Sequence, residues 1–152
     1  MRILGIDPGI GRMGWGIIDK QGQKTSPVVF GCFETSKQEE QEQRLLRIYQ
    51  FITSLLAKEP VDEVAIEDLF FNTNAKTAFQ VGQARGVILL MAAQRSLPIF
   101  VYTPLQVKVA VAGYGRAEKK QIQEMVRVIL QLKTVLNPMT VLTPWLQLSR
   151  TV

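Results

Sequence analysis

The sequence predicts an α/β fold with a mixed five-stranded sheet, in which an antiparallel meander is joined to parallel strands and helices flank the sheet. Three short apolar runs, 3–7, 14–19 and 28–34, follow one another with turn residues between them. Two further apolar runs, 61–68 and 97–102, alternate with stretches of helical periodicity. No repeat, low-complexity stretch or linker divides the 152 residues, which suffice for one core.

The first two strands are expected to form a hairpin around a turn rich in glycine. The apolar run 3–7 ends on Asp7, and Pro8 then presets φ for a tight turn in which Gly9 takes whatever conformation is needed. Residues 14–19 return as the second strand, and residues 28–34 complete the meander. One carboxylate is thereby placed at an edge of the sheet.

The remaining elements follow from apolar spacing and helix signals. The acidic run Glu39, Glu40 and Glu42 is expected to open a helix, because acids favour its N-terminal end. Pro60 breaks this helix, and the crossover places the next strand, 61–68, parallel to the first. The sequence then predicts a helix over 75–96, a strand over 97–102, a short helix over 106–111 and a basic helix over 117–132. Gly82 and Gly86, one turn apart on the long helix, favour close approach of another backbone.

Composition excludes several classes of protein. Hydrophobic residues make up 47 % of the chain and charged residues 20 %, which is typical of a soluble globular protein. No apolar run approaches the ~20 residues that span a bilayer, so no membrane association is expected. Cys32 is the only cysteine and there is no histidine, which excludes a disulfide framework and imidazole-based catalysis. Any catalysis must therefore depend on carboxylates, lysines, hydroxyls or a metal.

Charge is distributed unevenly along the chain. Residues 1–68 contain 8 Lys or Arg against 11 Asp or Glu, whereas residues 69–152 contain 10 against 2. A basic second half combined with acids at strand ends is typical of a protein that binds a polyanion. An ordinary basic protein remains the alternative interpretation of the charge alone.

Asp7 and Glu67 are the candidate site residues that the residue pattern itself indicates. Each ends an apolar strand, and adjacent parallel strands would bring both carboxylates to the same edge of the sheet, where ligand sites concentrate. Oxygen ligands without imidazole or thiolate suit Mg²⁺ or Mn²⁺. The alternatives are that Asp7 only caps the turn and that Glu67, next to Asp68, is a solvated strand end.

Six motifs in register resemble the RuvC-type Holliday-junction resolvases, over residues 1 to about 133. The resemblance implies a ribonuclease-H-like fold, a homodimer and Mg²⁺-dependent paired nicking of four-way DNA junctions, with Mn²⁺ as a substitute. It also implies a bacterial, cytoplasmic protein that works with a branch-migration helicase complex. The motifs are Gly5-Ile6-Asp7-Pro8-Gly9, Ala65-Ile66-Glu67, Asn74-Ala75, Gly82-Gln83-Ala84-Arg85-Gly86-Val87, Gln106-Val107-Lys108 and Ala117-Glu118-Lys119.

The resemblance also assigns roles to individual residues. Asp7 and Glu67 match metal-binding catalytic carboxylates, and Lys108 and Lys119 match lysines near the scissile phosphate, with roles in catalysis and DNA binding. Lys120 adds positive charge on the same helix as Lys119 and is a further candidate DNA contact.

Two further candidates for DNA binding carry open alternatives. Phe70 matches a phenylalanine that stacks on a base at the opened crossover, and such stacking is worth ~1–3 kcal/mol; the alternative is that Phe70 lies in the core. Arg85 could contact a phosphate or stabilise a structural network, and the sequence does not separate these two roles.

The pattern of the family breaks near residue 134. The chain is therefore divided into a nuclease domain, 1–134, and an aberrant tail, 135–152, that replaces the family's last helix. No Asp, Glu or His follows Glu124, whereas the family has two more carboxylates, spaced Asp-x-x-Asp or His-x-x-Asp and followed by Ala-Leu-Ala.

A shifted reading frame would account for this break. In the frame that starts on the last base of each codon, Met139–Thr140 must encode Asp, Leu142–Thr143 can encode a second Asp, and the next codons allow Ala-Leu-Ala. We therefore hypothesise that the tail is read out of frame.

Three other functions compete with a junction-resolving nuclease. The missing acids favour a catalytically impaired protein that binds junctions. The Gly-x-Asp-Pro-Gly opening is shared with the YqgF-type group, but the segment 67–87 argues against that group. An actin-like phosphotransferase needs two such domains around a nucleotide, and 152 residues are too few.

Overall fold

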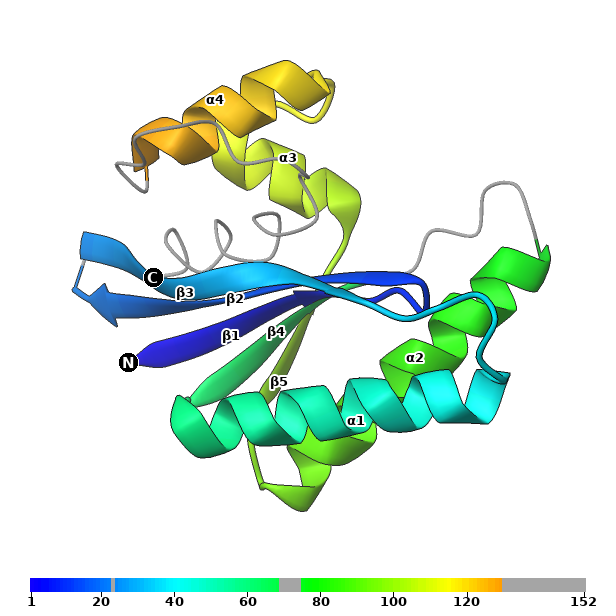
Figure 1. Ribbon diagram of the computed structural model, residues 1–152. Coiled ribbons are helices and arrows are strands. Elements are labelled where there is room, and N and C mark those ends of the chain that lie inside the picture. The colour runs from blue at the N-terminus through cyan, green and yellow to red at the C-terminus, as the bar shows by residue number, and fades with distance from the viewer. Residues whose placement is uncertain (23, 69–74, 130–152) are drawn as a thin grey trace.

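The computed structural model describes residues 1–22, 24–68 and 75–129. Five strands and four helices follow one another along these residues, and the predicted α/β class with a mixed five-stranded sheet is confirmed (Figure 1). The elements are β1 (Arg2–Asp7), β2 (Arg12–Gln21), β3 (Lys24–Glu34), α1 (Gln41–Lys58), β4 (Glu63–Glu67), α2 (Ala75–Gln94), β5 (Ile99–Tyr102), α3 (Pro104–Ala112) and α4 (Lys119–Ile129).

The strand order in the sheet is β3-β2-β1-β4-β5. β1, β2 and β3 form the predicted antiparallel meander, and β4 pairs in parallel with both β1 and β5. In the register of the central pair, Ile6 lies opposite Ile66. The crossover through α1 therefore places β4 beside β1, as the helix-then-strand order predicts.

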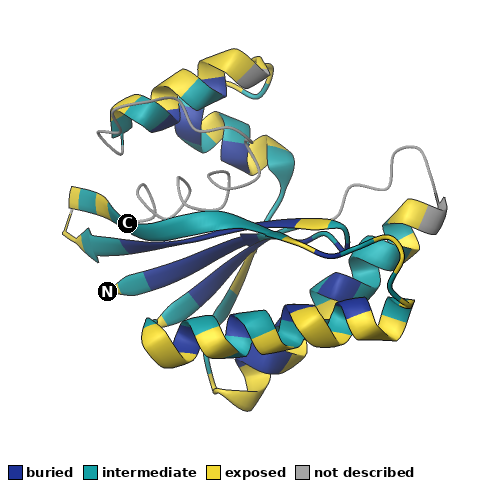
Figure 2. Ribbon diagram, viewed as in Figure 1, coloured by how far each residue is buried: buried dark blue, intermediate teal, exposed yellow. Residues whose placement is uncertain are grey.

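Helices cover both faces of the sheet. In Figure 1, α1 and α2 lie below the sheet and α3 and α4 lie above it. The larger core cluster lies between the sheet and the pair α1 and α2, and it includes Ile48 and Ile52 of α1 and Ile88 of α2. The smaller cluster lies between the sheet and the pair α3 and α4. Figure 2 shows that the central strands are buried between these two helix layers. In the described residues, no helix is long and apolar enough to cross a membrane.

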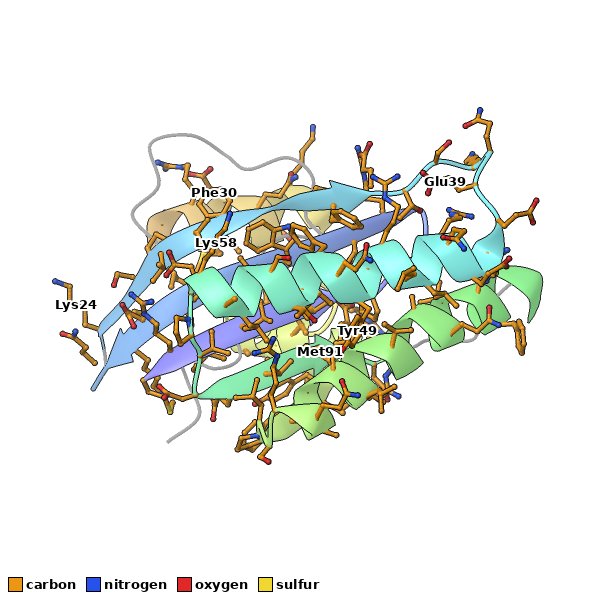
Figure 3. The ribbon with its side chains drawn as sticks, turned by 60° about the horizontal axis from the view of Figure 1, so that its bottom comes forward. Lys24, Phe30, Glu39, Tyr49, Lys58 and Met91 are labelled. Carbon is orange, nitrogen blue, oxygen red and sulfur yellow. The ribbon has the colours of Figure 1, made fainter. Side chains whose placement is uncertain are left out.

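Tyr49 and Met91 illustrate how the two helices below the sheet meet. Tyr49 of α1 packs against the cluster that contains Met91 of α2, and the two side chains are labelled next to each other in Figure 3. The Tyr49 hydroxyl also donates a hydrogen bond to Gln94 Oε1 at 2.9 Å. An apolar ring with a polar tip can thus join two helices at the rim of the core.

Several boundaries differ from the predicted ones for local physical reasons. α1 begins at Gln41, with Glu40 at its N-cap and Glu42 in its first turn as the acidic run predicts, whereas Glu39 lies before the helix and pairs with Arg47. In Figure 3, Glu39 lies near this end of α1 and Lys58 at the other. α3 begins at Pro104, two residues earlier than predicted, because Thr103 and Gln106 form a capping box.

Gly86 makes no close contact with another part of the described chain. A Cβ atom added to Gly86 would meet nothing within 4 Å, and the residue is exposed. Within the described chain no backbone approaches Gly86 closely, so the expected close approach stays a prediction for contact with another molecule.

Candidate active site

Asp7 and Glu67 lie side by side on one face of the sheet. Ile6 is paired with Ile66, so the next residues, Asp7 and Glu67, end adjacent parallel strands at the same edge. Ile3 and Ala65 belong to the cluster under α3 and α4. Because side chains alternate along a strand, Asp7 and Glu67 face that same side. The juxtaposition predicted from the sequence is confirmed.

Gly9 allows the chain to turn directly after Asp7. A Cβ atom at this position would lie 2.1 Å from the Arg12 carbonyl oxygen, a distance that no side chain tolerates. The backbone therefore closes tightly on itself between β1 and β2. This turn fixes the direction in which Asp7 leaves the sheet.

Burial makes both carboxyl groups reluctant to ionise. It raises the pKa of Asp7 from 3.8 to about 6. Burial, and then repulsion by Asp7, raises the pKa of Glu67 from 4.5 to about 7. The repulsion follows from the proximity of the two groups at the ends of adjacent strands. Two half-buried, mutually repelling carboxylates are an environment that a cation relieves.

The donor set fits a divalent metal ion bound through oxygen. Two carboxylates suit Mg²⁺ or Mn²⁺, which accept oxygen ligands and retain waters in the remaining positions. In residues 1–22, 24–68 and 75–129, no group of three or more His, Cys, Asp or Glu is placed to hold a metal. Asp7 and Glu67 therefore supply two ligands, and the rest of the coordination shell must come from elsewhere.

The two alternatives for these acids are not what the structure shows. Asp7 accepts no hydrogen bond from a described turn residue, so it does not cap the turn. Glu67 is partly buried and its pKa is raised, which a solvated strand end would not show. Both observations favour a site over a structural role.

The predicted lysines lie on the helices above the carboxylates. Lys108 is half-buried on α3, which begins two residues after β5. Lys119 is the first residue of α4, and Lys120 is exposed beside it. These helices cover the face of the sheet that carries Asp7 and Glu67. Phe70 lies outside the described residues.

Arg85 pairs with the residue that follows Glu67. Its Nη2 atom lies 3.7 Å from Asp68 Oδ1, and its Nε atom is buried without a hydrogen-bond partner. Of the two roles left open by the sequence, the described contact is the structural one, while donors remain for a further ligand.

Sequence reasoning missed the neighbours that extend the carboxylate row across the sheet. Tyr102 lies opposite Glu67 on β5, and Cys32 lies opposite Gly14, which is itself opposite Asp7. Repulsion by Asp7 is one of the effects that raise the pKa of Cys32, after burial. The signal that could have found them is the register of the meander, which places every second residue on one face.

Comparison with known proteins assigns this architecture to one family. The family model for crossover junction endodeoxyribonuclease RuvC matches residues 3–142. The RuvC protein of Desulfitobacterium hafniense is 52 % identical over 138 residues, covering 91 % of this chain and 84 % of the relative. That of Brevibacillus brevis is also 52 % identical over 138 residues, covering 91 % and 83 %.

Solved structures agree with this assignment. Thermus thermophilus RuvC in complex with Holliday junction substrate superposes with a TM-score of 0.89 at 34 % identity, covering 98 % of this chain and 92 % of that one. The yeast mitochondrial Holliday junction resolvase Ydc2 shares the fold, with a TM-score of 0.62 at 13 % identity, covering 82 % and 60 %. These resemblances confirm the ribonuclease-H-like fold.

The curated relatives named above come from bacteria, and nucleases of their family are metal-dependent. The match over residues 3–142, the two bacterial relatives at 52 % identity and the paired carboxylates at the sheet edge lead to one conclusion: this chain belongs to the RuvC family of crossover junction endodeoxyribonucleases.

Proposed function

We propose that this protein resolves four-way DNA junctions by metal-dependent hydrolysis of two phosphodiester bonds, with Mg²⁺ as the natural ion and Mn²⁺ as a substitute. The observation that carries the proposal is the pair of adjacent, half-buried carboxylates, Asp7 and Glu67, whose pKa values are raised to about 6 and about 7. This pair belongs to the face of the sheet that α3 and α4 cover, and these helices bear Lys108 and Lys120.

The chemistry divides between the carboxylates and the lysines. Divalent ions at such a site activate water and stabilise the leaving oxygen in phosphodiester cleavage. Asp7 and Glu67 would hold these ions, and both would lose their protons as the ions bind. Lys108 and Lys119 would neutralise charge on the scissile phosphate, since a positive group placed where charge develops lowers the barrier.

DNA binding is proposed to use the basic helices and one aromatic residue. Lys108, Lys119 and Lys120 would contact the DNA backbone, and Phe70 would stack on an unpaired base at the crossover. Stacking of this kind contributes ~1–3 kcal/mol. Arg85 would add a phosphate contact through the donors that Asp68 does not occupy. In support, residues 69–152 contain 10 Lys or Arg against 2 acids.

A homodimer is proposed because two strands must be cut at one junction. α2 presents an outer face on which Phe79 and Leu90 are 68 % and 57 % exposed, with Gly86 between them. Their spacing of seven and four residues places all three on one side of the helix. We assign this face to a second copy of the chain, whose α2 could approach closely over Gly86.

The wider setting is inferred from the family alone. A branch-migration helicase complex that delivers the junction is the proposed macromolecular partner, and the bacterial cytoplasm is the proposed location. In the described residues no helix could cross a membrane, and the relatives named above come from bacteria.

We infer that the nuclease domain comprises residues 1–134 and that residues 135–152 are an aberrant tail. The family model extends to residue 142, eight residues beyond this boundary. The tail contains no Asp, Glu or His, whereas the alternative frame encodes Asp across Met139–Thr140 and permits Asp-x-x-Asp. Two more carboxylates would complete a two-metal site. The nucleotide sequence of codons 130–152 tests this inference, because codons that forbid the second Asp would sink it.

The function itself is tested with a labelled four-way junction, with and without Mg²⁺, scored for gel shift and for symmetric nicks. We expect Mg²⁺-dependent nicks that disappear in Asp7→Asn. A shift without nicks would contradict the nuclease and favour the junction-binding alternative. A second version of the gene carries one inserted base near codon 135, so that the alternative frame is read. The protein that it encodes is expected to cut junctions faster than the present chain.

A further inference from the structure

A buried arginine on α1 holds the turn that follows Asp7. Arg44 is only 9 % exposed, and its Nε atom donates a hydrogen bond to Thr35 Oγ1 at 2.9 Å. The Thr35 hydroxyl donates in turn to the Ile10 carbonyl oxygen, and the Thr35 amide donates to the Gly11 carbonyl at 3.1 Å. One threonine thus joins the arginine to two residues of the β1–β2 turn.

The guanidinium of Arg44 has no carboxylate within 4.0 Å in the part of the chain that the structure describes. Burying a charged group without an ionic partner costs free energy of folding, and packing alone does not account for an arginine at this position. The contact that the arginine does make is directed at the turn beside Asp7.

A second arginine holds the residue that follows Glu67. Arg85 of α2 pairs with Asp68 at 3.7 Å, and the Asp68 amide donates to the Tyr102 carbonyl at 2.7 Å. The end of β4 is therefore fixed both to β5 and to the helix layer below. An arginine therefore supports the chain directly after each strand that ends in a carboxylate: Arg44, through Thr35, after β1, and Arg85, through Asp68, after β4.

Two glutamine contacts join the two helices at this end. Gln41 Nε2 donates to Gln83 Oε1 at 2.5 Å, and Gln80 Nε2 donates to Gln41 Oε1 at 3.3 Å. Gln41 lies one helical turn before Arg44, and Gln83 lies two residues before Arg85. We call these polar residues of α1 and α2, together with the two residues after β3 and β4 that they contact, the arginine belt. Its members are Thr35, Gln41, Arg44, Asp68, Gln80, Gln83 and Arg85.

We propose that the arginine belt sets the separation of Asp7 and Glu67, and so the geometry of the metal site, from the opposite side of the sheet. Asp7 and Glu67 face α3 and α4, whereas the belt helices cover the other face. Apart from the phosphate contact proposed for Arg85, the belt therefore acts through the backbone: its members are positioning residues. The inference rests on the proposed function, because it assumes that the carboxylates hold metal.

The physical need for such a belt follows from the site itself. The ionised carboxylates repel each other, and the last ladder pair between their strands is Ile6 with Ile66. Metal sites require ligands placed to within about 0.5 Å, held by supporting residues. The belt supplies this support at both strand ends.

Thr35→Val is the sharpest test, because it removes the hydroxyl and keeps the shape. Thr35→Ser is the matched control, since it retains the hydroxyl. The measurements are amide hydrogen exchange over residues 9–12, Mn²⁺ affinity by calorimetry, junction affinity by gel shift in EDTA, and single-turnover cleavage. In Thr35→Val we expect exchange about tenfold faster, and Mn²⁺ affinity and cleavage 10- to 100-fold lower, which is about the usual cost of losing an outer-shell contact. Junction affinity should change less than about threefold, because Thr35 is distant from the lysines proposed to bind DNA on the other helix layer.

Asp68→Asn tests the second arm, with Glu59→Gln as a control. Glu59 pairs with Arg2 at 2.8 Å, far along the sheet from the carboxylates, so its loss should leave Mn²⁺ affinity unchanged. Asp68→Asn should lower Mn²⁺ affinity and cleavage without unfolding the protein, and it keeps the proposal testable if Thr35→Val fails to fold.

Three outcomes overturn the belt: unchanged exchange and Mn²⁺ affinity in Thr35→Val, a Thr35→Ser protein as impaired as Thr35→Val, or equal effects of Asp68→Asn and Glu59→Gln. A wild-type protein that binds no Mn²⁺ through Asp7 and does not cut would instead overturn the proposed function. In that case the exchange rates alone decide whether the belt holds the turns.

Discussion

The two helix layers of this protein differ in what they do for the same sheet. The layer of α1 and α2 covers the larger apolar cluster and meets the ends of the strands through two arginines, Arg44 on Thr35 and Arg85 on Asp68. The layer of α3 and α4 covers a smaller cluster and faces both carboxylates. The layer of α1 and α2 thus chiefly stabilises the fold and orients the strand ends, whereas the layer of α3 and α4 forms the site with the carboxylates. Substitutions on opposite layers should therefore separate stability from cleavage.

The largest expected effect is the loss of cleavage in Asp7→Asn and Glu67→Gln. Each substitution removes one of two metal ligands, so single-turnover cleavage should fall more than about 100-fold, beyond the usual cost of losing an outer-shell contact. The stability of the metal-free protein should not fall, because no described contact depends on either charge. Asp62→Asn, at the other end of the sheet, is the control. Cleavage within tenfold of wild type in either variant would remove these residues from the site.

A substitution in the layer of α1 and α2 is expected to do the opposite, lowering stability while leaving cleavage nearly unchanged. Ile52 is 1 % exposed in the cluster under α1 and α2. Ile52→Ala should lower the free energy of unfolding by about 2–5 kcal/mol, because it leaves a cavity in a closely packed core. Urea unfolding measures this loss, and cleavage below the unfolding transition should stay within about threefold of wild type. A protein that lost activity while still folded would contradict the division between the layers.

The third prediction concerns pH, where the carboxylate face itself lowers stability. The unfolded chain ionises Asp7 and Glu67 near 3.8 and 4.5, while the folded protein keeps the protons to about 6 and about 7. The native state therefore binds more protons across this window, so stability is greatest below about pH 4, falls until about pH 7 and then levels off.

Asp7→Asn should remove about half of this fall, because the shifts of Asp7 and Glu67 are of similar size. In EDTA above pH 7, the variant should be about 3 kcal/mol more stable than wild type, since one pKa unit corresponds to about 1.4 kcal/mol. At pH 4 the difference should vanish. Thermal unfolding from pH 4 to pH 8 measures it, and Mg²⁺ should restore stability to the wild type alone. An equal difference at both pH values would refute burial of the charge as its cause.

The sequence predicts the carboxylate pair better than it predicts what surrounds it. The positions of Asp7 and Glu67 follow from two general constraints, the crossover rule and the shared edge of parallel strands. The start of α3 was placed two residues too late, although the capping-box spacing of Thr103 and Gln106 marks it in the sequence. These features depend on local sequence or on topology, both of which a single chain displays.

The contacts of Arg44 and Arg85 were not predictable in the same way. Which acid or hydroxyl an arginine reaches depends on how far its helix is rotated and shifted over the sheet, and core packing decides both. Arg85 pairs with Asp68 and Arg44 with Thr35 only because α1 and α2 seat their apolar stripes as they do.

The smallest expected effect sharpens the comparison most directly, because it uses one chemical change on each layer. Lys120 on α4 and Lys58 on α1 are both exposed. If the upper layer binds DNA, Lys120→Gln should weaken junction binding roughly threefold and reduce the slope of log affinity against log salt by about 0.9, the effect of one lost phosphate contact. Lys58→Gln removes the same charge from the other layer and should change neither quantity. Equal losses in both variants would mean that net charge, and not a defined face, attracts the DNA.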